Sequence, residues 1–206
     1  MCRMTEVSSL TGRLLVATPA LADPNFDRAV VLLLDHDDEG SLGVVLNRPT
    51  PVTVGDVLAA WAPLAGEPGV VFQGGPVSLD AALGLAVVPG EEGPCARPGE
   101  GEPSPAAGGG PLGWRRVFGA IGLVDLEAPP ELLGPALSAL RIFAGYAGWG
   151  PGQLEAEVAE GAWYVVESEP GDVSSPRPEE LWRQVLRRQR GELALVATCP
   201  DDPSLN

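Results

Sequence analysis

Residues 89–113 form the segment that most limits how this chain can fold. Eight glycines and six prolines fill 14 of its 25 positions, and four glutamates are added. A segment of this composition buries too little apolar surface to offset the conformational entropy that it would lose on ordering. We therefore predict that it is a mobile surface insert. Strand-like segments on both sides resemble parts of one sheet, which favours a single domain over residues 1–206 with a flexible tail at 1–9. Two domains joined by this segment are the alternative.

Strand-length apolar runs dominate the rest of the chain. Residues 29–34 and 42–46 are two such runs separated by a polar turn, which predicts a hairpin. Further strands are expected at 12–18, 69–72, 83–88, 115–121, 142–146, 163–166 and 193–197, and helices at 53–61, 130–140, 153–160 and 175–190. This irregular interleaving is typical of an α+β fold with a mixed sheet and flanking helices.

The expected helix at 175–190 has the clearest boundary signals. Ser175 is placed to cap it, prolines occupy its first turn, and Gly191 follows its arginine-rich end. Its apolar stripe consists of Leu181, Trp182, Val185 and Leu186. The cluster of Arg183, Arg187, Arg188 and Arg190 on the same segment is expected to form a solvated face.

The basic residues of the chain are unusual in type and number. All 13 are arginines, against 28 acidic residues, and the net charge is −15. The lack of lysine excludes a Schiff-base lysine and a P-loop lysine, and the negative charge makes direct nucleic-acid binding unfavourable. One histidine cannot build a multi-histidine metal site, and the acidic loop that begins at Asp35 has Leu46 where a calcium loop needs glutamate. We therefore expect no metal and no cofactor.

Cysteine usage and hydropathy indicate the compartment. Cys2, Cys95 and Cys199 are odd in number and have no recognisable spacing, which argues against a disulfide framework. The N-terminus lacks the pattern of a signal peptide, and no segment reaches the roughly 20 apolar residues of a membrane helix. These features predict a soluble cytoplasmic protein without a membrane partner.

Two charged side chains near the first hairpin are candidates for chemistry. His36 lies among aspartates, so it could act as a general acid or as a pH-sensitive contact, or simply make a structural hydrogen bond in a turn. Arg48 follows a strand and could fork two hydrogen bonds to a carboxylate or phosphate. We expect, however, that Arg48 pairs with an internal acid such as Asp56.

Two glycine-rich stretches are the other candidates. Gly74 and Gly75 follow a strand and could cradle an anion with their backbone, although a tight structural turn is favoured. Residues 145–155 read as a loop with aromatic and polar side chains. This loop either lines a pocket or places Tyr146 and Trp149 as plugs at a sheet edge.

Several of these stretches together resemble one family. The sequence 10–19 (LTGRLLVATP), Asp23–Val30, His36 with Gly40 and Gly43, and Asn47-Arg48-Pro49 resemble the N-terminal signature of the bacterial AlgH/YqgE family. Gly74-Gly75-Pro76-Val77, the 145–155 run, the Leu181-Trp182 helix and the terminal Pro203–Asn206 match in the same order. The resemblance implies a strongly twisted sheet that curls toward a pseudo-barrel, with helices outside, in a cytosolic bacterial protein. Members are often described as transcriptional regulators, although the motifs contain no recognised DNA-binding element.

The resemblance carries ten candidate ligand-binding residues and assigns no catalytic residue. They are Arg28, His36, Asn47, Arg48, Gly74, Gly75, Tyr146, Trp149, Gln153 and Glu155. We expect a non-enzymatic binding or regulatory module for an unknown small molecule or protein partner. The alternatives are a hydrolase or transferase with His36 as acid/base and Glu155 as its partner, and a regulator that binds DNA directly.

Overall fold

A computed structural model describes residues 9–21, 23–90 and 111–199. Ten strands of this part of the chain form one sheet in the order β10-β1-β2-β3-β9-β6-β8-β7, with β5 pairing β9 and β4 pairing β5. The strands are β1 (Arg13–Ala17), β2 (Val30–Asp37), β3 (Gly40–Val45), β4 (Pro49–Thr53), β5 (Val70–Gln73), β6 (Val77–Val87), β7 (Trp114–Phe118), β8 (Ile121–Val124), β9 (Ala139–Trp149) and β10 (Trp163–Glu167).

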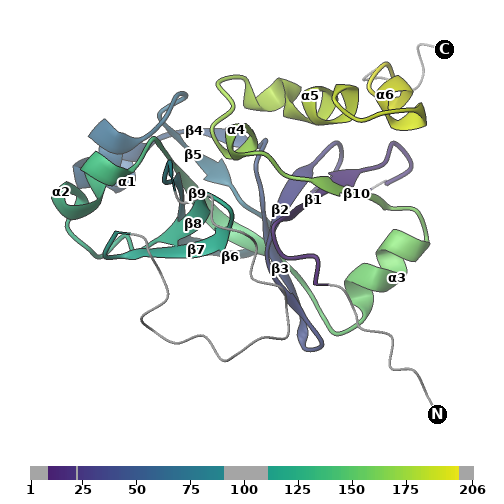
Figure 1. The fold of residues 1–206 in the computed structure, drawn as a ribbon, viewed down its shortest axis with the longest axis horizontal. Coiled ribbons are helices and arrows are strands. Elements are labelled where there is room, and N and C mark those ends of the chain that lie inside the picture. Colours follow the sequence, from purple (N-terminus) through teal and green to yellow (C-terminus); the bar gives the residue numbers. More distant parts are fainter. Residues whose placement is uncertain (1–8, 22, 91–110, 200–206) are drawn as a thin grey trace.

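The long strand β9 joins the two halves of the sheet. Its end pairs with β3, and its beginning pairs with β6 on one side and β5 on the other. Only the β5–β9 pairing among the described strands is parallel, so the sheet is mixed. The sheet curls into a half-barrel with a few short helices outside it (Figure 1), which confirms the predicted α+β class.

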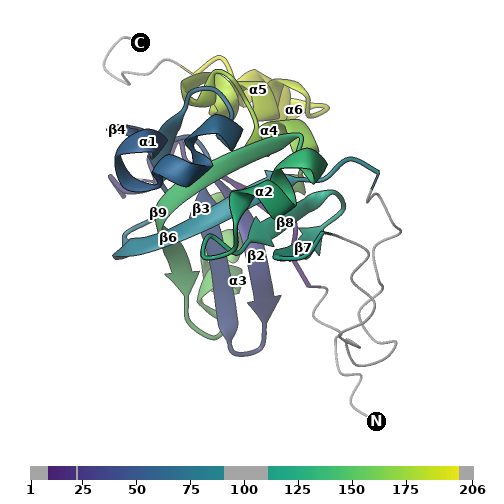
Figure 2. The ribbon, with the colours of Figure 1, turned by 90° about the vertical axis from the view of Figure 1, so that its left-hand side faces the viewer.

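Short helices cover the sheet in three places. They are α1 (Val54–Val57), η1 (Ala59–Leu64), α2 (Pro130–Leu133), η2 (Gly134–Ala136), α3 (Gln153–Ala159), α4 (Pro170–Val173), η3 (Pro178–Glu180), α5 (Leu181–Arg187) and α6 (Glu192–Val196). Helices α5 and α6 lie on one side of β1, β2 and β10, and α3 lies on the other (Figure 1). Helices α1 and α2 lie over β9, β6 and β8 (Figure 2).

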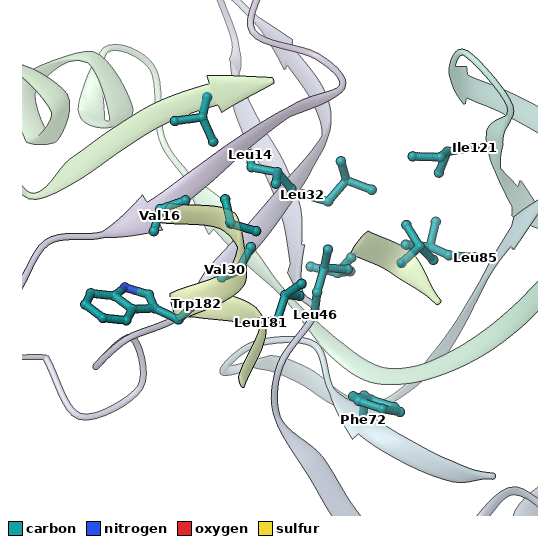
Figure 3. Close-up of a cluster of buried hydrophobic side chains, with 14 of the residues drawn as sticks. Leu14, Val16, Val30, Leu32, Leu46, Phe72, Leu85, Ile121, Leu181 and Trp182 are labelled. Atoms are coloured by element: carbon teal, nitrogen blue, oxygen red, sulfur yellow. The ribbon is translucent and has the colours of Figure 1, made fainter. Parts of the chain in front are cut away.

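Because side chains alternate between the two faces of a strand, the sheet presents an apolar face to the helices on each side. Leu14 and Val16 of β1 join the cluster that contains Trp182 of α5, whereas Leu15 joins the cluster that contains Leu154 of α3. Figure 3 shows Trp182 and Leu181 beside side chains of β1 and β2 in the first cluster. The Trp182 indole also donates a hydrogen bond to the Ala17 carbonyl at 2.8 Å, which fixes α5 on the sheet.

The C-terminal helices differ from the sequence expectation. The helix expected at 175–190 begins later, as η3 and α5, because Arg177 precedes a proline and has an extended φ of −126°. Ser175 does not cap it. The strand expected at 193–197 is the helix α6, because Leu193, Val196 and Ala197 lie at helical spacing against the α5 cluster.

Several strand boundaries also differ. The expected loop at 145–155 is strand β9 up to Trp149, since Gly145 takes a left-handed φ of +72° and lets the strand continue past an irregularity. The extended stretch expected at 115–121 is instead the hairpin β7–β8. The helix expected at 130–140 ends at Ala136, just after Pro135, and the helix expected at 53–61 is split into α1 and η1.

The insert predicted at 89–113 and the tail predicted at 1–9 fall almost entirely outside the described residues, as do Cys2, Cys95 and the terminal Pro203–Asn206. Their assignments, and the single domain, stay predictions. Strand β6 precedes the insert and pairs with β8 and β9, which follow it. Among the described residues, no helix combines the length and apolar character required to span a bilayer.

Candidate functional site

Three of the predicted residues meet in one cavity. Arg28 lies in the turn before β2, and Asn47 and Arg48 lie between β3 and β4. Residues from the C-terminal helices complete the cavity, which has a volume of about 170 Å³ and is lined by Asp27, Arg28, Asn47, Arg48, Glu179, Trp182 and Arg183. Segments from the two ends of the chain therefore build it together.

Asn47 positions the turn that carries Arg28. Its side-chain oxygen accepts the Val30 N–H at 2.9 Å, and its amide nitrogen donates to the Arg28 carbonyl at 2.9 Å. Arg28 itself has a left-handed φ of +51°, which a non-glycine residue adopts only when its surroundings hold it there. Asn47 is 4% exposed, and both polar groups of its side chain form hydrogen bonds with the backbone. This arrangement favours a role in shaping the cavity over direct contact with a ligand.

Arg48 is a partly desolvated cation of the cavity wall. Its guanidinium donates a hydrogen bond to the Asp27 carbonyl. Burial lowers the pKa of Arg48, and the nearby Asp27 carboxylate raises it in part. The expected pairing with Asp56 is wrong, because the Asp56 carboxylate instead accepts the Thr53 hydroxyl at 2.8 Å at the start of α1.

The other two arginines are ordered by Trp182. The guanidinium carbons of Arg28 and Arg183 lie 4.9 and 5.9 Å from the indole centroid. Arg183 also donates to the Ala197 and Cys199 carbonyls at 2.5 and 3.0 Å, which ties α6 to α5. The cationic groups are thus fixed before any ligand arrives.

The described lining of the cavity gathers arginines in a chain that is acidic as a whole. Its described residues include three arginines and two carboxylates, Asp27 and Glu179, in a protein of net charge −15. Guanidinium groups in a concave, partly desolvated place stabilise an anion there more than they would at an open surface.

His36 lies elsewhere, under helix α3. Its Nδ1 is 2.8 Å from the Ser41 hydroxyl, and its Nε2 is 3.6 Å from the Glu155 carboxylate. The structure therefore brings together the predicted pair. The His36 side chain is only 1% exposed, which favours a role in holding α3 to the β2–β3 hairpin. Acid/base chemistry by this pair stays a prediction.

The Trp149 side chain of β9 and the Gln153 side chain of α3 converge on Glu157 of α3. Trp149 and Trp163 donate their indole N–H groups to Glu157 Oε2 at 3.0 and 2.8 Å, and Gln153 donates to Oε1 at 2.9 Å. Phe26 packs on both indoles, with centroid distances of 6.2 and 5.5 Å. These contacts form a partly buried anchor, the α3 anchor, between α3 and the sheet.

Gly74 and Gly75 mark a close approach of backbones. A Cβ on Gly74 would lie 2.3 Å from the Gly145 carbonyl oxygen, and one on Gly75 would lie 2.2 Å from the Tyr146 carbonyl carbon. Gly74 also donates to Ala144 and accepts from Val45, so it links β9 to β3. Tyr146 is half-buried against the main apolar cluster.

The ten candidate residues therefore fall into three places, the cavity, the α3 anchor and the glycine junction. Their roles as ligand-binding residues stay predictions. The sequence did not predict that Trp182 and Arg183 line the cavity. Residue spacing shows which side chains share one face of a helix, but it does not show which other segment that face packs against.

Sequence reasoning also missed Arg141. It is 2% exposed on β9, donates to the carbonyls of Glu67 and Ser175, and lies 4.3 Å from the Phe72 ring centroid. Burial lowers its pKa to about 10, with partial compensation by Glu179. The signal in the sequence that could have indicated a buried arginine is its position inside the apolar run Leu140–Phe143.

Comparison with known proteins places the chain. The family model described as AlgH-like (DUF179) matches residues 14–194. The chain belongs to this AlgH-like family. A UPF0301 protein of Streptomyces coelicolor, SCO2948, is 80% identical over 206 residues and is covered in full, as is this chain. A UPF0301 protein of Thermobifida fusca is 50% identical, with 96% of both chains covered.

Two solved structures share the AlgH-like fold. Protein DIP2367 from Corynebacterium diphtheriae is 32% identical, with a TM-score of 0.79 and 92% of each chain covered. The AlgH protein from Pseudomonas aeruginosa is 26% identical, with a TM-score of 0.64, covering 98% of this chain and 100% of that one. The resemblance drawn from the motifs is thereby confirmed.

Proposed function

We propose that this AlgH-like protein is a non-enzymatic binding module that holds a small anion, such as a phosphate or carboxylate group, in the arginine cavity. One observation carries the proposal. Arg28, Arg48 and Arg183 line a single cavity of about 170 Å³ in a strongly acidic chain. Planar guanidinium groups bind carboxylates and phosphates through pairs of charge-assisted hydrogen bonds.

The size of the cavity supports a small ligand or one small charged group of a larger ligand. Its volume is below the roughly 300 Å³ at which pockets for drug-sized ligands begin. The contacts of Trp182, Asn47 and the Asp27 carbonyl hold the surrounding groups in place, so little ordering entropy is lost on binding. An anion would also offset the desolvation of Arg48, which the nearby Asp27 carboxylate offsets only in part.

Thermal unfolding with matched salts tests the proposal. Inorganic phosphate and succinate are compared with sodium chloride at equal ionic strength. A ligand at 100 times its Kd adds about 2.7 kcal/mol to the free energy of unfolding, which corresponds to a rise in Tm of about 5–10 °C for a chain of this size. Arg48→Met should remove that rise, whereas Arg187→Met, on the exposed part of α5, should keep it.

Two results would overturn the proposal. One is a Tm that responds to phosphate and succinate no more than to chloride. The other is an Arg48→Met variant that unfolds like the parent protein without ligand and still shows the full rise with phosphate. Direct nucleic-acid binding stays an unfavoured prediction. Arg188 of the expected basic face donates two hydrogen bonds to the Asp172 carboxylate, at 2.5 and 2.7 Å, so its charge is already paired.

A further inference from the structure

A second concave surface, which we call the apolar groove, lies away from the arginine cavity. It has a volume of about 390 Å³ and lies between β4 and α1 on one side and the first half of β6 on the other. Its lining residues are Thr50, Val52, Val57, Leu58, Val71, Leu79, Asp80, Ala81, Ala82, Ile142, Phe143 and Ala144. This volume falls within the range of small-molecule sites, which are mostly apolar with few polar groups.

The walls of the groove expose large aliphatic side chains to solvent. Val52, Val57 and Leu79 are 42, 57 and 55% exposed, although each stands at the edge of a floor made by buried Ile142 and Phe143. Apolar side chains that gather around one hollow, rather than lying singly, mark a binding surface. A ligand in the groove would cover these walls and extend the apolar core.

The β6 wall is held in an unusual conformation. Ser78 has a left-handed φ of +50°, and the pairing of β6 with β9 is irregular between Val77 and Ala82. A non-glycine residue in this region costs about 1–3 kcal/mol, so the surrounding structure must enforce it. The irregularity presents Leu79 and Asp80 to the groove instead of pairing them regularly with β9.

The charge of the groove decides the chemistry of its occupant. Of its lining residues, all of them within the described part of the chain, Asp80 alone is charged. The Thr50 hydroxyl is engaged, because it donates to the Val71 carbonyl at 2.7 Å. Among the described side chains of the lining, the polar group offered to a ligand is therefore the Asp80 carboxylate beside an apolar floor.

We infer that the apolar groove binds a small amphipathic cation, a molecule with an aliphatic or aromatic body and one amine group that pairs with Asp80. The apolar body lies on Ile142 and Phe143, and the ammonium group meets the Asp80 carboxylate at the rim. This site is independent of the anion cavity, so failure of either proposal leaves the other in place.

Calorimetric titration of the full chain with two ten-carbon probes tests the inference. Decylammonium and decanoate each have ten carbons in one unbranched chain and differ in the sign of charge, and both are used below micelle-forming concentration. Decylammonium should bind with one-to-one stoichiometry and more tightly than decanoate. Asp80→Asn should weaken decylammonium by about 2- to 5-fold, the range of an exposed ion pair, and reduce the preference between the two probes.

A matched pair of variants separates groove binding from general attraction to an acidic surface. Leu79→Ser should weaken decylammonium by about 5- to 30-fold through lost apolar contact. Leu132→Ser changes a leucine of 58% exposure on α2, outside the groove, and should leave binding unchanged. Thermal unfolding of each variant without probe checks that it remains folded.

Three results would overturn the inference. The first is equal affinity of the parent protein for decanoate and decylammonium. The second is an equal loss of binding in Leu79→Ser and Leu132→Ser. The third is sedimentation that shows a dimer which Leu79→Ser alone dissociates, because the groove would then be covered by a second copy of the chain.

Discussion

Glu157 is predicted to be a main determinant of stability on the α3 side of the sheet. The Glu157→Ala change leaves the indole N–H groups of Trp149 and Trp163 without their acceptor, at 6 and 3% exposure. A buried donor that loses its partner costs about 1–3 kcal/mol, so two cost about 2–6 kcal/mol. Glu157 is half-buried, and water that reaches the vacated space reduces the expected loss to about 2–4 kcal/mol.

Urea unfolding followed by tryptophan fluorescence measures this loss. With an m-value of about 2 kcal/mol/M, the midpoint should fall by about 1–2 M. Glu157→Gln is the matched variant, because its amide oxygen can still accept both indole protons, and its midpoint should fall much less. Glu160→Ala, on an exposed residue at the end of α3, should leave the midpoint almost unchanged.

The reasoning is refuted if Glu157→Ala unfolds within about 0.5 kcal/mol of the parent protein, the range of ordinary surface substitutions. It is also refuted if Glu157→Gln loses as much stability as Glu157→Ala. The charge of the carboxylate, and not its role as a shared acceptor, would then be what the two tryptophans require.

Two further substitutions test the framework around the proposed sites. Arg188→Ala removes the guanidinium that pairs with the Asp172 carboxylate, whose side chain is only 4% exposed. The free energy of unfolding should therefore fall by about 3 kcal/mol in urea titrations. Arg187→Ala, at an exposed position, should lower it by less than about 0.5 kcal/mol. Gly75→Ala places a Cβ 2.2 Å from the β9 backbone and should lower the Tm strongly or prevent soluble expression, whereas Gly69→Ala, with open space at its Cβ, should behave like the parent protein. A soluble Gly75→Ala protein with an unchanged Tm would contradict the close approach.

The sequence predicts most of the strands because their signal is local. Runs such as Ala29–Leu34 are buried on both faces and remain apolar at every position. The segment 193–197 shows the limit of that signal, since a short apolar run fits a buried strand and a buried helix equally until its neighbour α5 is known. The segment 145–149 shows another limit, because a glycine-rich sequence indicates a loop unless pairing with neighbouring strands, here β6 and β3, makes it part of a sheet.

The candidate sites were predictable only in part, for a related reason. Arg28, Asn47 and Arg48 stand out in the sequence, and the predicted hairpin of residues 29–34 and 42–46 connects Arg28 to Asn47. Their meeting with Arg183 depends on where α5 packs on the sheet, which Trp182 decides through a hydrogen bond to Ala17. The apolar groove left no motif in the sequence. Val57 reads as an ordinary residue of the helix expected at 53–61, and Val52 and Leu79 lie outside every expected strand and helix.

The two hydrogen bonds that Asn47 makes to the backbone connect the occupancy of the cavity to the start of strand β2. Its carboxamide binds the Arg28 carbonyl beside the cavity and the Val30 amide at the start of a core strand. Amide exchange at Val30 therefore requires that the cavity wall open first. A molecule bound to the arginines should slow deuterium uptake at the Val30 amide. The exchange rate of this amide therefore reports whether the cavity is occupied.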